Sequence, residues 1–271
     1  MLAIDLSGKK ALVMGVANER SIAFATAQKL HEAGAELAIT YQGDRVKLLV
    51  EKATRHMPNV RLYELDVTDE ARLKEVMADL GENWGGIDYI VHSIAFAPRR
   101  AMDGRYIETT REDWLLAMEV SAYSLVAVAR EAEPYWNSGG SMVTFSYYAA
   151  EKVVPKYNVM GIAKSALEAS VRMLAYELGP KGLRVNAVSA GALRTLSARG
   201  IPGFTLLWDH VNAVAPLKRP VTHEEVAQAS VFLLSPLASG ITGETLYVDA
   251  GFHAVGIQLT EEQIPKKNAN S

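Results

Sequence analysis

Short apolar runs alternate with segments of helical periodicity along most of the chain. The apolar runs predict strands at residues 10–16, 36–40, 60–67, 87–95, 141–146, 183–190 and 244–251. Helical patterns lie between them, at residues 21–33, 43–56, 69–84, about 111–136, about 155–178 and 222–235, the last opening with Thr222 and Glu225 as a capping box. Strands that alternate with helices indicate the α/β class, in which a doubly wound parallel sheet has helices on both faces. We therefore expect about seven strands, with ligands beyond their carboxyl ends.

Residues 191–221 break this alternation. Glycines and prolines recur there, yet the segment also contains Phe204, Leu207 and Trp208. An apolar but irregular segment after the carboxyl end of a strand favours a lid over an apolar ligand. An ordinary long connection packed on the core is the alternative. We expect one domain over residues 1–258, with the substrate-binding lid at about 192–210 and a polar C-terminal tail at 259–271.

Composition excludes several functional classes. The 271 residues are 49% hydrophobic and 22% charged, which is typical of a soluble globular protein with a large core. A net charge of −3 gives no reason to expect nucleic acid or an anionic membrane as a partner. The absence of cysteine excludes disulfides, thiol nucleophiles and thiolate metal sites, and we expect no metal. No apolar segment resembles a signal sequence or a membrane span, so we expect a cytoplasmic protein.

The turn after the first strand has some features of a phosphate site. Gly15 begins it, and Ser21 and Ile22 would open the next helix, where backbone N–H groups favour a phosphate. The dinucleotide pattern G-x-G-x-x-G is absent, however. A serine that merely caps its helix explains these residues equally well.

Two further strand ends lie where an adenosine would bind. Gln42 follows the second strand and could hold a ribose 2′-OH, although Arg45 and Lys47 just beyond it could meet a 2′-phosphate. Asp66 and Val67 end the third strand. The carboxylate could accept the adenine amino group, and a helix N-cap is the alternative.

The stretch "YNVMGIAK" places Tyr157 and Lys164 on one face of a predicted helix. Seven residues at 100° each fall about 20° short of two full turns, roughly 10 Å along the axis. A phenol and an ammonium on one stripe could act as a catalytic pair. A rim aromatic and a solvated amine are the simpler interpretation of these two residues alone.

Taken together, these segments resemble the short-chain dehydrogenase/reductase family, and more narrowly the bacterial NADH-dependent enoyl-[acyl-carrier-protein] reductases of fatty acid synthesis. The resemblance covers roughly residues 5 to 255 and rests on "GVANERSIA", "LDVTD", "VHSIAFAP", "FSYYAAEKVVPKYNVMGIAKSALEASVR", "GLRVNAVSAGALRT" and "GITGETLYVDAGF". It implies a Rossmann-type fold, NADH as the cofactor, acyl carrier protein as the partner that carries the substrate, and a homotetramer. The apolar faces of the predicted helices at 111–136 and 155–178 agree with self-association.

The resemblance also gives the spacing of the possible catalytic residues a meaning. Ordinary family members use Tyr-x-x-x-Lys with a serine about thirteen residues before the tyrosine. Counted from Lys164, that tyrosine would be Met160 and that serine Tyr147. The resemblance therefore implies conjugate reduction of a trans-2-enoyl thioester, with Tyr157 at the enolate oxygen and Lys164 at the cofactor ribose. Tyr147 would line the site near the thioester without a defined role.

The same resemblance assigns the rest of the site. Residues implied to contact the cofactor are Gly15, Ser21, Ile22, Gln42, Asp66, Val67, Ser93, Ile94, Lys164, Leu193 and Thr195. Residues implied to contact the acyl chain are Ala97, Tyr157, Met160, Phe204 and Leu207. The lid stretch "GIPGFTLLWDH" has no Lys or Arg, so the basic candidates for meeting an acidic carrier protein are Arg194, Arg199, Lys218 and Arg219.

Two alternatives remain open at this point. A family member that reduces a ketone or a 3-oxoacyl thioester would need the serine and tyrosine that positions 147 and 160 lack. A regulatory nucleotide-binding protein could have kept the fold and lost the reaction. The intact set of Tyr147, Tyr157 and Lys164 argues against that second alternative.

Overall fold

The seven predicted strands form one parallel sheet within residues 4–195 and 203–264, the parts of the chain that the computed structural model describes. They are β1 (Lys10–Met14), β2 (Glu36–Tyr41), β3 (Arg61–Glu64), β4 (Ile87–His92), β5 (Trp136–Ser146), β6 (Arg184–Ala190) and β7 (Thr245–Val248). Their order in the sheet is β3-β2-β1-β4-β5-β6-β7, and all pairs are parallel. The order reverses between β1 and β4, as in doubly wound folds, and this confirms the predicted fold class.

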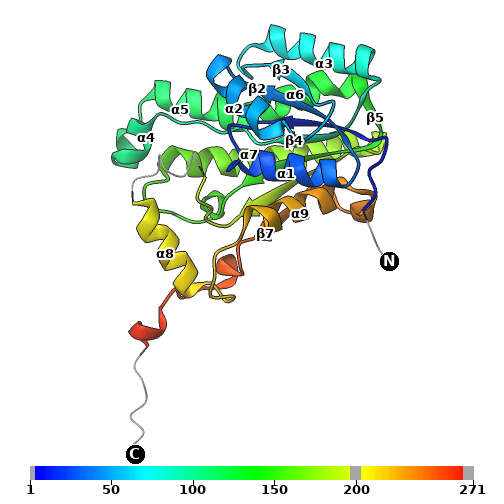
Figure 1. The fold of residues 1–271 in the computed structure, drawn as a ribbon. Coiled ribbons are helices and arrows are strands. Elements are labelled where there is room, and N and C mark those ends of the chain that lie inside the picture. The colour runs from blue at the N-terminus through cyan, green and yellow to red at the C-terminus, as the bar shows by residue number, and fades with distance from the viewer. Residues whose placement is uncertain (1–3, 196–202, 265–271) are drawn as a thin grey trace, which may run out of the picture.

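Helices cover both faces of this sheet (Figure 1). The helices α1 (Ile22–Glu32), α2 (Asp44–Thr54) and α9 (His223–Leu234) contribute to one apolar core. The second core, on the other face, is built with α3 (Glu70–Trp84), α6 (Ser124–Ala132) and α7 (Asn158–Leu178). The other α-helices of the described residues are α4 (Arg99–Asp103), α5 (Arg111–Met118) and α8 (Phe204–Val214), and α8 adds Val211 and Val214 to the first core.

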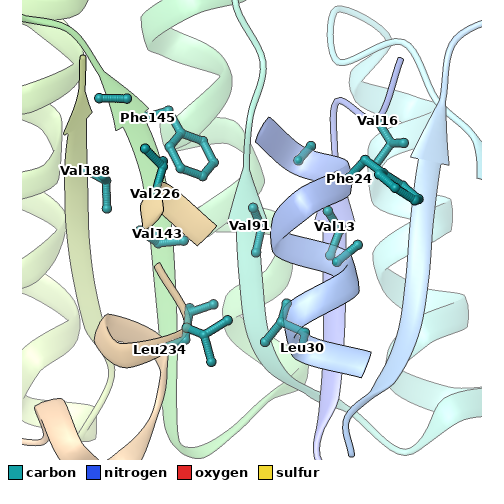
Figure 2. Packing of buried hydrophobic residues seen from close by; sticks show 14 of the residues in the cluster. Val13, Val16, Phe24, Leu30, Val91, Val143, Phe145, Val188, Val226 and Leu234 are labelled. Carbon is teal, nitrogen blue, oxygen red and sulfur yellow. The ribbon is translucent and has the colours of Figure 1, made fainter. Parts of the chain in front are cut away.

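Strand β1 shows why its sequence is apolar without alternation. Ala11 and Val13 lie in the core of the α1 and α9 face, while Leu12 and Met14 lie in the opposite core. Successive side chains of a strand point to opposite faces, so a central strand covered on both faces needs apolar residues at every position. Figure 2 shows the first of these cores, where Val13, Phe24 and Leu30 pack together with Val91 and Leu234.

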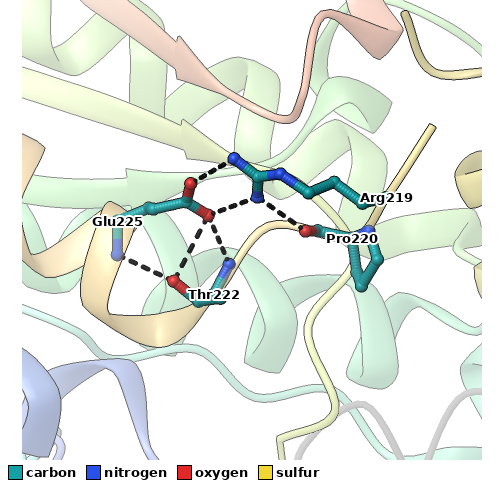
Figure 3. Close-up of polar contacts among 4 residues, drawn as sticks. All are labelled: Arg219, Pro220, Thr222 and Glu225. Atoms are coloured by element: carbon teal, nitrogen blue, oxygen red, sulfur yellow. Dashed lines mark hydrogen bonds and ion pairs between the residues drawn. The ribbon is translucent and has the colours of Figure 1, made fainter. Parts of the chain in front are cut away.

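The start of α9 follows the predicted capping box. The Thr222 hydroxyl accepts from the Glu225 N–H at 3.1 Å, and the Glu225 carboxylate accepts from the Thr222 N–H at 2.9 Å. Arg219 adds a bidentate contact to the same carboxylate and donates to the Pro220 carbonyl (Figure 3). This guanidinium holds the pKa of Glu225 down at about 2. These contacts stabilise the end of the segment that connects α8 to α9.

The helix at about 155–178 begins later than predicted. It starts at Asn158, with Tyr157 as its N-cap. Lys156 has φ of +67°, a left-handed conformation that is incompatible with a right-handed helix, so the helix does not extend before Tyr157. The Asn158 amide donates to the carbonyl oxygens of Ala101, Met102 and Gly104. Contacts with α4 therefore determine where α7 begins.

The helix predicted at about 111–136 is interrupted. A π-helical turn at Glu119–Tyr123 separates α5 from α6, and Trp136 already belongs to β5. The Ser121 hydroxyl in this turn accepts from the Phe96 N–H at 2.9 Å and donates to the Phe96 carbonyl at 3.0 Å. The extra residue of a π turn is common at functional sites. Here it directs Ser121 towards the loop that follows β4.

Residues 191–221 are less irregular than predicted, because they contain the eleven-residue helix α8. Residues 196–202 of the expected lid lie outside the described residues. Strands β3 and β4 are shorter than predicted, since the chain leaves the sheet after Glu64 and His92. The boundary at residue 258 between the domain and the polar C-terminal tail stays a prediction. Among the described helices, none has the combined length and apolarity that crossing a bilayer requires.

Candidate active site

A cavity of about 490 Å³ lies at the carboxyl ends of four neighbouring strands. Gly15, Ser93, Tyr147 and Gly191 line it, and each of them directly follows a strand, respectively β1, β4, β5 and β6. The cavity includes the position between β1 and β4 where the strand order reverses. Open parallel sheets bind ligands at this position, which agrees with the expectation from the sequence.

The part of the cavity next to β1 suits an anionic dinucleotide. Gly15 has φ of +87°, and a Cβ there would overlap the carbonyl oxygen of Ser93. Ser21 caps α1 by accepting from the Phe24 N–H at 3.2 Å, so Ile22 begins the helix at the cavity. Helix starts of this kind favour phosphate groups. No Asp or Glu is present among the described lining residues, whereas Lys164 is.

Tyr147 and Tyr157 lie side by side in the cavity, with ring centroids 5.0 Å apart and planes tilted by 57°. Burial raises the pKa of Tyr157 well above its usual value, and Tyr147 adds to the effect. Burial, with a contribution from Asp249, raises the pKa of Tyr147 to about 12. Both phenols therefore keep their protons at neutral pH and can act as hydrogen-bond donors.

Lys164 lies two turns along α7 and is only 6% exposed. Its Nζ donates to the Phe145 carbonyl at 2.6 Å, which leaves two protons for other acceptors. Burial lowers the pKa of this ammonium to about 8, and the nearby Glu168 opposes the shift. At neutral pH the group is mostly charged. The Tyr157 and Lys164 pair is thus a feature of the cavity and not of the solvated surface.

His92, the last residue of β4, joins three elements beneath the cavity through its two ring nitrogens. Its Nδ1 lies 3.0 Å from the Thr144 hydroxyl, and its Nε2 lies 2.9 Å from the Ser124 hydroxyl. Complete burial, together with the charge of Lys164, lowers the pKa of His92 to about 3. The ring is therefore neutral, and it holds β4 to β5 and to α6.

An apolar pocket adjoins Tyr157. Met160 is 5% exposed and packs with Ala97 and Met102 in a small cluster against which Tyr157 lies. Phe204 and Leu207 of α8 line the same cavity. Because these side chains come from several distant segments, the pocket exists only in the folded chain. Its apolar lining suits an acyl chain.

Most of the predicted site residues line this single cavity: Gly15, Ser21, Ile22, Ser93, Ile94, Ala97, Tyr147, Tyr157, Met160, Lys164, Leu193, Thr195, Phe204 and Leu207. Gln42, Asp66 and Val67 do not line it. The sequence prediction did not include these further lining residues: Ala17, Ala95, Phe96, Arg99, Met102, Phe145, Ser146, Ala190, Gly191 and Ala192. Several of them adjoin strand ends, and that position was the signal that could have identified them.

Gln42 and Asp66 instead contact each other at the ends of neighbouring strands. The Gln42 amide donates to the Asp66 carboxylate at 2.6 Å. The same carboxylate accepts from the N–H and hydroxyl of Thr68. Asp66 does not cap α3, because the N-cap is Asp69. Burial raises the pKa of Asp66, but these hydrogen bonds keep it below its usual value. Their contact with a cofactor stays a prediction.

The basic candidates for carrier docking are engaged within the chain. Arg194 lies over the Trp208 ring at 3.9 Å, Lys218 donates to the Ala213 carbonyl, and Arg219 pairs with Glu225. Arg199 lies outside the described residues. The docking surface for a carrier protein therefore stays a prediction.

The sheet is doubly wound, and its positively charged cavity lies where the strand order reverses. The cavity contains the turn at Gly15 and a Tyr and a Lys from one helix. These features define a dinucleotide-dependent oxidoreductase of the short-chain dehydrogenase type. Residues 15–253 match the family described as enoyl-(acyl carrier protein) reductase. The chain belongs to this family.

Individual relatives agree over almost the whole length. Enoyl-[acyl-carrier-protein] reductase (NADH) 1 of Rhizobium meliloti (strain 1021) is 49% identical over 94% of each chain. Enoyl-[acyl-carrier-protein] reductase (NADPH) FabI of Staphylococcus aureus (strain MRSA252) is 45% identical over 93% of this chain and 99% of that one. The crystal structure of enoyl-[acyl-carrier-protein] reductase (NADH) from Aquifex aeolicus VF5 superposes with a TM-score of 0.90 at 47% identity, covering 93% and 99% of the two chains.

Proposed function

We propose that this protein is an NADH-dependent enoyl-[acyl-carrier-protein] reductase that reduces the C2–C3 double bond of trans-2-enoyl thioesters in fatty acid elongation. The observation that carries the proposal is the position of the cavity phenol. Tyr157 lies two helical turns before Lys164, while Met160 occupies the position one turn before it. The relatives named above support the same activity.

The residues of the cavity fit such a cofactor. Gly15 allows close approach, the start of α1 would hold a phosphate, and Lys164 would hold ribose hydroxyls. Bound NADH supplies the hydride that adds to C3. These assignments remain proposals for this chain.

Tyr157 would act on the charge that the reaction creates. As the hydride adds to C3, the electron pair of the double bond moves towards the thioester oxygen at C1, and a proton adds later at C2. The Tyr157 phenol keeps its proton at neutral pH, so it can donate a hydrogen bond to that oxygen. Tyr147 would exclude water beside it and hold its ring in place. Met160 and Ala97 would receive the acyl chain.

The direct test compares two thioesters. NADH absorbance is followed with a crotonyl thioester and with an acetoacetyl thioester at equal concentrations. Faster reduction of the crotonyl substrate is expected. Faster reduction of the acetoacetyl substrate would favour the 3-oxoacyl alternative, and turnover of neither would favour a binding protein that lacks the reaction.

We also propose acyl carrier protein as the partner that presents the substrate, and a homotetramer as the assembly. Exposed apolar side chains support self-association: Met173 is 60% and Tyr176 81% exposed on α7, and Leu115 is exposed on α5. Light scattering should give four times the 29.5 kDa of one chain, and a monomer mass would reject the assembly. A cytoplasmic location stays a prediction.

A further inference from the structure

Two side-chain hydrogen bonds tie the end of β5 to α7 at adjacent residues. Lys164 donates to the Phe145 carbonyl at 2.6 Å, and the Ser146 hydroxyl donates to the Glu168 carboxylate at 2.5 Å. Tyr147 follows directly, with its ring 5.0 Å from that of Tyr157. The position of Tyr147 relative to α7 therefore depends on this pair of bonds.

The mechanism above gives Glu168 no role, yet it is only 7% exposed. A buried carboxylate is costly unless hydrogen bonds and charges compensate for it. Ser146 provides the hydrogen bond, while Lys164 and Arg172 of α7 provide positive charge. Burial raises the pKa of Glu168; the Ser146 bond opposes this, Glu151 adds to it, and the two cations oppose it.

A further ionisable neighbour of Glu168 is Tyr247 on β7. The Tyr247 hydroxyl donates to the Glu151 carboxylate, and burial raises the pKa of Tyr247, with smaller contributions from Glu151 and Glu168. The described surroundings of Glu168 thus contain one acid, two cations and two hydroxyl groups. Glu168 lies one helical turn from Lys164, the spacing at which side chains of one helix interact.

We propose that Glu168 is a positioning residue of the active site: it holds Ser146, and through it the Tyr147 and Tyr157 pair, and it places a negative charge one turn from Lys164. This inference rests on the proposed function. It extends the site by a group that touches neither cofactor nor substrate.

Glu168→Gln tests the charge, because the amide keeps the shape and can still accept from Ser146. Without the negative charge, Lys164 loses its proton at a lower pH. NADH affinity, measured from the fluorescence of bound NADH between pH 6.5 and 9, should therefore fall at a pH about one unit below that of the unchanged protein. Coincident pH profiles for the two proteins would overturn the charge role.

Ser146→Ala tests the hydrogen bond while keeping the charge. We expect kcat with a crotonyl thioester to fall by about tenfold, equal to about 1.4 kcal/mol, with NADH affinity changed by less than about threefold. Glu168→Ala combined with Ser146→Ala should cost less than the sum of the two single changes. Additive effects, or an unchanged kcat, would overturn the positioning role.

Glu177→Gln provides the matched control, because Glu177 is exposed on the same helix. This variant should leave both the pH profile and kcat unchanged, and thermal unfolding should confirm that every variant is folded. The test of Glu168 can be distinguished from the test of the reductase activity. A protein that reduces no enoyl thioester would reject the reductase proposal, whereas the pH profile of NADH binding would still test the charge of Glu168.

Discussion

Replacing Lys164 with methionine should stabilise the cofactor-free protein while weakening NADH binding. Burial lowers the pKa of Lys164 from 10.5 to about 8. A difference of about 2.5 units corresponds to roughly 3 kcal/mol, the cost of burying the charged form. Methionine fills similar space without that charge, but the lost hydrogen bond to Phe145 takes back about 1–2 kcal/mol. The net gain at pH 7 should be about 1–2 kcal/mol.

The sign of the pH dependence follows from the same shift. Below pH 8 the folded and unfolded states both carry the charged lysine, so the cost is fully present. Between pH 8 and 10.5 the unfolded state binds more protons, and the stability of the unchanged protein rises. The advantage of Lys164→Met should therefore disappear by about pH 10.

Urea unfolding at pH 7 and pH 10 measures this effect. Lys152→Met provides the control, because Lys152 is exposed, and it should change the free energy of unfolding by no more than about 0.5 kcal/mol. A Lys164→Met protein that is less stable than the unchanged protein at pH 7, with a difference that stays constant up to pH 10, would refute the reasoning.

Three further predictions concern the reaction. Tyr157→Phe should slow enoyl reduction by up to about 10²–10³ with nearly unchanged NADH affinity, while Tyr176→Phe on the exposed face of α7 should have no effect on either; a Tyr157→Phe protein with full activity would reject the donor role. NADH should be preferred to NADPH in kcat/KM, because the Asp66 carboxylate beside Gln42 would repel a 2′-phosphate; a tenfold preference for NADPH, about 1.4 kcal/mol, would contradict this. Amide exchange in α8 (Phe204–Val214) should slow when NAD⁺ and an acyl ligand bind together, and equal protection with and without them would reject a closing lid.

The sheet was predictable because the period of the apolar pattern depends directly on the local geometry of strands and helices. All seven strands agree with apolar runs, and the capping box at Thr222 located the start of α9 to the residue. The limits of the elements were less predictable. The π turn at Glu119–Tyr123 and the late start of α7 depend on contacts of Ser121 and Asn158 with other segments. Periodicity along the chain does not contain that information.

The candidate site shows the same division. The strand pattern indicated a site at the carboxyl ends of the sheet, and the family resemblance assigned Gly15, Ser93 and Tyr147 to it. Helical spacing placed Tyr157 and Lys164 on one face of a helix, but their roles came from the family resemblance. Glu168 could not be predicted, because its role arises from a contact with Ser146, twenty-two positions earlier in the chain and on another element.

The position at which hydride enters the substrate tests the central claim most directly. NADH carrying two deuterium atoms at C4 of the nicotinamide is used to reduce a crotonyl thioester in ordinary water, and the product is examined by NMR. We expect one deuterium at C3 and a proton from solvent at C2, as conjugate reduction with Tyr157 at the thioester oxygen requires. Deuterium at C1 or C2, or a product without deuterium, would contradict the account.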